Sequence, residues 1–100
     1  MKKFLYLYSG GKTPATPAAG RAMLEDWKAY FAKIEGRLDS GGPLGPHKSI
    51  GVGSGSQAQP NGYSIIEAAD LDQAVVLTKG HPHLANNGTI DVCEIQPIPD

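Results

Sequence analysis

A surplus of charge of either sign is missing from this sequence. Its 9 Lys and Arg residues are balanced by 10 Asp and Glu residues, for a formal net charge of −1 at pH 7. A protein that neutralises a nucleic-acid backbone needs a concentrated basic surface, and the basic residues here are scattered along the chain. We therefore expect no nucleic-acid partner.

Cysteine and long apolar runs are also scarce. The single cysteine, Cys93, has no partner for an internal disulfide, which favours a reducing compartment. The apolar run at Phe4–Tyr8 is shorter than the roughly seven to fifteen residues of an export signal. No run reaches the ~20 apolar residues of a membrane-spanning helix. We expect a cytoplasmic protein without a membrane partner.

Chain length limits the number of hydrophobic cores. The sequence has 100 residues, of which 40% are hydrophobic, and this is enough for one modest core but not for two. We expect a single domain over residues 1–100.

Apolar patterns predict four strands. Three segments rich in strand formers are expected at Phe4–Tyr8, Tyr63–Ala68 and Thr89–Ile98. A weaker edge strand, interrupted by glycine and proline, is expected at Leu44–Val52. A flexible hairpin connection over Gly53–Gly62 would follow it.

Two helices are predicted between these strands. The first begins near Pro17 and ends near Ser40, because apolar residues recur at spacings of three and four before Gly41. The second is capped by Asp70, with Gln73 reaching back, and stops at Gly80 and Pro82. The apolar stripe of the first helix consists of Met23, Leu24, Trp27, Tyr30, Phe31, Ile34 and Leu38.

The order of these elements indicates an α+β fold. It is the ferredoxin-like β-α-β-β-α-β arrangement, in which an antiparallel sheet carries two helices on one face. Phe4–Tyr8 is apolar at every position, so both faces of the sheet should be buried. Because two helices cover only one face, we predict a homodimer with its two sheets packed face to face.

Several segments resemble the YCII-related family, relatives of the DGPF-containing proteins. Members are small ferredoxin-like domains that form dimeric α/β barrels, and the resemblance implies a cleft near the loop that carries His81. Some relatives use a histidine on the first helix and an aspartate after the second. The corresponding positions here are Trp27 and His81, and the D-G-P-F turn is absent. The resemblance rests on F-L-Y-L-Y, on a helix with Trp27 and Phe31, on G-Y-S-I-I-E-A-A-D-L-D-Q-A, and on G-T-I-D-V-C-E-I-Q-P-I.

His81 is the candidate catalytic residue, as an acid or a base. Pro82 favours an extended backbone at His81, so that His83 projects to the same side and is a candidate ligand-binding residue. With His47, Asp26 or Asp91 the two imidazoles would complete a zinc site, but no third ligand lies at a telling spacing, so we predict no metal site and no cofactor. The alternative for His81 and His83 is that both are ordinary residues of an exposed loop.

Tyr8 and Ser9, at the end of the first strand, are further candidates for ligand binding, together with Trp27. The alternative for Trp27 is a place in the core, because it lies on the apolar stripe. Cys93 has no basic neighbour in sequence, and we expect a buried, unreactive thiol.

Three functions remain open. The first is a small enzyme with His81 as acid or base, and the second is a non-catalytic module that binds a small molecule in the same cleft. The third is an interaction or regulatory partner protein that acts through its dimer surface.

Overall fold

The α+β class expected from the sequence is confirmed, with four strands in one antiparallel sheet. The structure is a computed structural model that describes residues 1–51 and 59–99. The strands lie in the order β2-β3-β1-β4. None of the helices in these residues is long and apolar enough to cross a membrane. The elements are β1 (Lys2–Gly10), α1 (Pro17–Lys33), β2 (Arg37–Pro43), β3 (Pro60–Ala68), α2 (Leu71–Val76), α3 (Pro82–Ala85) and β4 (Gly88–Glu94).

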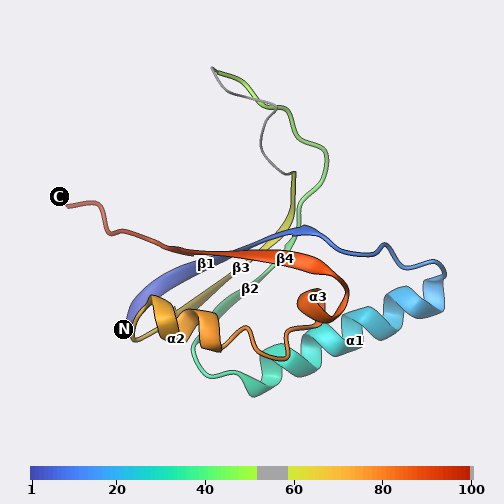
Figure 1. Cartoon of the computed structure of the whole chain (residues 1–100), viewed down its shortest axis with the longest axis horizontal. Helices are drawn as coiled ribbons and strands as arrows, with labels where there is room; N and C mark the ends of the chain where they lie inside the picture. The colour runs from blue at the N-terminus through green and yellow to red at the C-terminus, as the bar shows by residue number, and fades with distance from the viewer. Residues whose placement is uncertain (52–58, 100) are drawn as a thin grey trace.

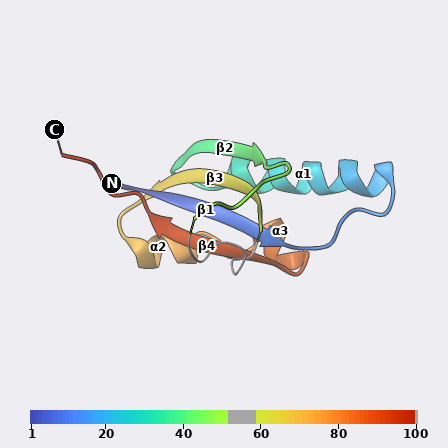
Figure 2. The ribbon, with the colours of Figure 1, turned by 90° about the horizontal axis from the view of Figure 1, so that it is seen from above.

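All three helices lie on one face of the sheet (Figure 1). Figure 2 looks onto the opposite face, with the helices behind the strands. Side chains of the central strand β1 alternate between the two faces, as the pleat of a strand requires. Phe4 and Tyr6 are fully buried beneath the helices, whereas Leu5 and Leu7 on the open face are half-buried. The core therefore lies between the sheet and the helices.

Two tyrosine hydroxyl groups connect the helices to one another and to the sheet. Tyr6 in β1 donates to the carbonyl oxygen of Ala74 in α2 at 2.5 Å. Tyr30 in α1 donates to the carbonyl oxygen of Leu77, just after α2, at 2.6 Å. Burial raises the pKa of both hydroxyls, so both stay protonated and act as donors. These bonds fix the segment that leads from α2 into α3.

The predicted end of the first helix and the predicted second strand are both wrong. Helix α1 stops at Lys33, because Ile34 adopts an extended backbone, and Gly36 then reverses the chain with φ +86°. Strand β2 occupies Arg37–Pro43 instead of Leu44–Val52 and pairs with β3. Of the predicted connection over 53–62, residues 53–58 lie outside the described residues, and residues 60–62 belong to β3.

The capped second helix is confirmed. The Asp70 side chain accepts from the backbone N–H of Gln73 at 2.8 Å, and the Gln73 side chain accepts from the backbone N–H of Ala69. After α2 the chain forms a further short helix, α3, which was not predicted. Pro82 occupies its first turn, where a missing N–H costs nothing. The last strand, β4, ends at Glu94 and not at Ile98.

Candidate functional site

A cavity of about 450 Å³ lies between α1 and the half of the sheet formed by β2 and β3. Residues of β2 and β3 line one side of it, and Gly41, Gly42 and Gly62 among them bring backbone close to the cavity. On the other side, α1 presents residues at spacings of three and four, which lie on one face of a helix. The α1 residues are Gly20, Met23, Leu24, Trp27, Lys28 and Phe31.

The apolar stripe of α1 serves two purposes along its length. Near the end of the helix, Tyr30 and Phe31 are buried in the core. Earlier in the helix, Met23 and Trp27 are only half-buried, and Leu24 is 60% exposed. The glycines opposite this part of the helix offer no side chains that would fill the space. The part of the stripe from Met23 to Trp27 therefore lines a cavity, and Phe31 is buried in the core and also borders the cavity.

His81 is the cap of α3 and belongs to a buried chain of hydrogen bonds. Its Nδ1 accepts from the backbone N–H of His83 at 3.0 Å, so the proton of the neutral imidazole is on Nε2. Nε2 lies 3.0 Å from the Tyr8 hydroxyl and donates to it. Tyr8 donates to Ser64 Oγ at 2.7 Å, and Ser64 donates to the carbonyl oxygen of Ser40 at 2.7 Å. Every donor in the chain has an acceptor.

The side chains that form this series of hydrogen bonds are neutral at physiological pH. Burial, together with the neighbouring imidazole of His83, lowers the pKa of His81 to about 4. Burial also raises the pKa of the Tyr8 hydroxyl above its ordinary value. His81 is only 1% exposed and reaches the cavity through Tyr8, which lines it. Its position holds the Tyr8 hydroxyl and the start of α3 in place.

His83 lines the cavity directly. Its Nε2 donates to the carbonyl oxygen of Ser9 at 2.8 Å, which leaves Nδ1 with a lone pair. Among the described residues Nδ1 has no hydrogen-bond partner, and every fully buried side-chain nitrogen or oxygen there has one. Nδ1 is therefore accessible, as a hydrogen-bond acceptor or a base.

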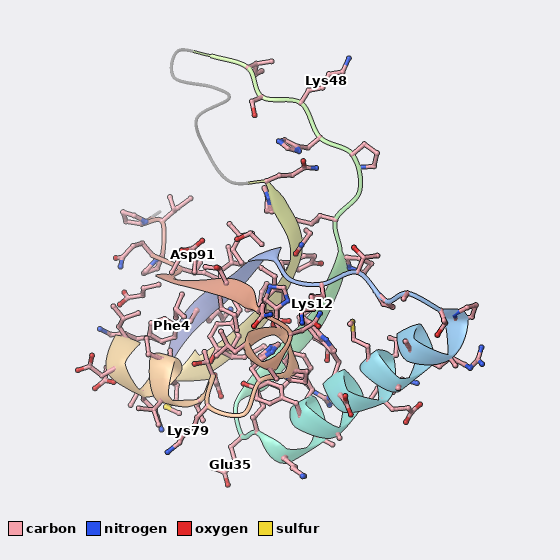
Figure 3. The ribbon with its side chains drawn as sticks, turned by 45° about the vertical axis from the view of Figure 1, so that its right-hand side comes forward. Phe4, Lys12, Glu35, Lys48, Lys79 and Asp91 are labelled. Carbon is pink, nitrogen blue, oxygen red and sulfur yellow. The ribbon has the colours of Figure 1, made fainter. Side chains whose placement is uncertain are left out.

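The connection between β1 and α1 is attached to the end of α3. Lys12 lies beside α3 (Figure 3). Its backbone N–H donates to the carbonyl oxygen of Asn86 at 3.0 Å, and the Asn86 side chain donates to the carbonyl oxygen of Lys12 at 2.7 Å. The two bonds anchor the start of this connection to the end of α3.

The five residues that the sequence singled out lie together. The ring centroids of Tyr8 and Trp27 are 4.9 Å apart, and those of Trp27 and His81 are 4.8 Å apart. Tyr8, Trp27 and His83 line the cavity, His81 lies behind Tyr8, and Ser9 contributes its carbonyl oxygen to His83.

Sequence reasoning missed several residues of the site. Arg37 was assigned to the end of a helix, yet it begins β2 and lines the cavity together with Lys28. Ser64 has a recognisable signal, because it is a polar residue that shares the buried face of its strand with Ile66 and Ala68. The expectation for Cys93 is wrong: the thiol is exposed, because it pairs with Leu5 on the open face of the sheet. The described residues hold no group of three or more His, Cys, Asp or Glu that could bind a metal ion.

No protein-family model, curated protein or solved structure matches this chain. The function is therefore inferred from the geometry and chemistry of the site.

Proposed function

We propose that the protein binds a small organic molecule with a flat, largely apolar body in the cavity beneath α1. The observation that carries this proposal is the cavity itself, whose volume of about 450 Å³ is typical of small-molecule sites. Such sites combine apolar walls with a few fixed polar groups. Here Trp27 and Phe31 supply aromatic surface, and Tyr8 and His83 supply the polar groups.

The polar groups are held in place before any ligand binds. Tyr8 is fixed by His81 on one side and by Ser64 on the other. His83 is fixed by Ser9. Groups that are already ordered lose little conformational entropy on binding, which raises affinity. Acid–base chemistry in this cavity would use His83 Nδ1, because both nitrogens of His81 are hydrogen-bonded, and His81 would act as a positioning residue.

Ligand binding can be followed with the intrinsic fluorescence of Trp27, the one tryptophan of the chain. We expect 4-tert-butylbenzamide and related substituted benzenes, which absorb little where tryptophan is excited, to change this fluorescence in a saturable manner. Met23→Glu should weaken binding at least tenfold, because a carboxylate in the apolar wall must be desolvated when the ligand binds. The matched control is Ala22→Glu, which adds the same charge at an exposed neighbouring position outside the cavity.

Two results would contradict the binding site. One is the absence of any fluorescence change with a panel of neutral, acidic and hydroxylated aromatic compounds. The other is an equal loss of affinity in Met23→Glu and Ala22→Glu, since the cavity would then have no special part in binding.

The proposed fold in its finer detail is the ferredoxin-like arrangement of the YCII-related type, with two copies joined through their sheets. Its support is the open face of the sheet, where Leu5 pairs with Ile65 on one side and with Cys93 on the other. The neighbouring pair is Leu7 and Tyr63, and these two residues, like Leu5 and Ile65, are half-buried. None of the described helices covers this face (Figure 2).

The dimer can be tested by light scattering coupled to size exclusion. We expect the wild type to have twice the mass of one chain at micromolar concentration. Ile65→Lys should reduce it to the mass of one chain, because a lysine would meet an apolar surface of the second copy. Glu35→Lys changes an exposed position in the turn after α1; this variant is the control and should stay dimeric. A wild-type monomer would contradict the dimer. It would favour the second candidate function, a partner protein that binds another protein through the open face.

A further inference from the structure

The charged residues that line the cavity are all cationic. Lys28 lines it from α1 and Arg37 from the start of β2, and no Asp or Glu is among the lining residues. This is contrary to the chain as a whole, in which 10 acidic residues outnumber 9 basic ones. The imbalance within the cavity is therefore local and needs an explanation of its own.

Neither cation has a strong partner in the described part of the chain. The ion pairs found there are Lys2 with Glu94 and Lys28 with Glu25. The second joins Nζ and Oε1 at 3.7 Å between side chains that are 71% and 75% exposed, and such a pair contributes little energy and exchanges readily. Arg37 belongs to neither pair.

The nearest acidic residue on β2 does not neutralise Arg37. Asp39 uses Oδ1 to accept from the backbone N–H of Gly41 at 2.8 Å, and it pairs with Ile65 of the open face. It is not among the residues of the cavity. An anion entering the cavity would therefore meet Arg37 without a competing carboxylate, and Lys28 with only the exposed carboxylate of Glu25 beside it.

Resting on the proposed function, we infer that the ligand is an aromatic or similarly flat carboxylic acid. The planar guanidinium of Arg37 matches a carboxylate with two parallel hydrogen bonds, and Lys28 adds a second positive charge. The apolar body of the acid lies against Trp27 and Phe31. A hydroxyl substituent on that body donates to His83 Nδ1, the accessible acceptor of the site. The ligand class is thus an aryl carboxylate, and a hydroxylated one gains a further contact.

A pair of compounds that differ only in charge tests this inference. We expect 4-tert-butylbenzoate to bind at least tenfold more tightly than 4-tert-butylbenzamide, measured by the fluorescence of Trp27 and by calorimetry. Arg37→Gln should remove most of this preference by weakening the binding of the benzoate alone, because only Lys28 then remains, and should leave the affinity for the benzamide unchanged. Arg21→Gln removes the other arginine, which is exposed and outside the cavity, and should keep the preference.

The outcomes separate this inference from the proposed function. Equal affinities of the wild type for both compounds would overturn the carboxylate preference and leave the binding site in place. A preference that is undiminished in Arg37→Gln would overturn the assignment of Arg37. A failure of both compounds, together with the rest of the aromatic panel, to bind the wild type would overturn the proposed function itself.

Discussion

Gly88→Ala is expected to lower the free energy of unfolding by about 2–4 kcal/mol and to displace the imidazole of His83. Gly88 begins β4, and a Cβ there would overlap the His83 ring. The ring cannot easily move away, because its Nε2 is bonded to Ser9 and its other side faces Tyr8, at a centroid distance of 5.2 Å. The glycine is thus required by the position of a site residue.

Urea unfolding with a second-site variant checks this expectation. His83→Ala removes the ring with which the new methyl group would overlap. Adding Gly88→Ala to His83→Ala should therefore cost much less stability than adding Gly88→Ala to the wild type. Gly42→Ala is the control, because a Cβ at this strand glycine would meet no atom within 4 Å. Equal effects of Gly88→Ala and Gly42→Ala, or no coupling between positions 88 and 83, would contradict the packing described here.

Acid is expected to destabilise the protein through His81. The pKa of this imidazole is lowered from 6.5 to about 4 by burial and by His83. Between these two values the unfolded chain binds a proton that the folded protein does not bind, so protonation favours unfolding. The contribution of His81 is fully present above pH 6.5 and is lost as the pH falls towards 4. The loss is at most about 3 kcal/mol.

The variant His81→Asn isolates this effect. Asparagine caps helices well and keeps an acceptor for the N–H of His83, but it does not titrate. Between about pH 7 and about pH 4, the wild type should lose up to about 3 kcal/mol more stability than the variant, measured by urea unfolding at each pH. Carboxylates titrate in the same range in both proteins, and their effect cancels in the comparison. Equal losses in the two proteins would show that His81 protonates as freely when folded as when unfolded.

The sequence predicted those elements whose pattern is local. Strand β1 has an uninterrupted run of strand formers, and β3 has Tyr63, Ile65 and Ile66 close together. The cap of α2 depends on Asp70 and Gln73 alone. The end of α1 was not predictable in this way. Ile34 and Leu38 continue the helical spacing, so periodicity alone extends the helix beyond its true end. The chain turns at Gly36 and pairs with β3, and tertiary pairing overrides local propensity there.

The site residues that the sequence predicts are polar residues near the ends of strands and helices. Tyr8 and His81 were candidates for this reason, and the fold brings them within hydrogen-bond distance. Arg37 was missed because its place depends on where α1 ends. Cys93 was misjudged because the position of a side chain on one face or the other depends on the register of β4 against β1. Register is a property of two paired strands, so the sequence of β4 alone does not determine it.

The central claim is that the cavity beneath α1 is a binding site, and NMR chemical-shift mapping with 4-tert-butylbenzoate tests it most directly. We expect the largest shifts at the indole N–H of Trp27 and at the backbone amides of Gly62 and His83, with little change at Leu5 and Cys93 on the open face. Shifts confined to the open face, or no shifts at millimolar ligand, would contradict the claim.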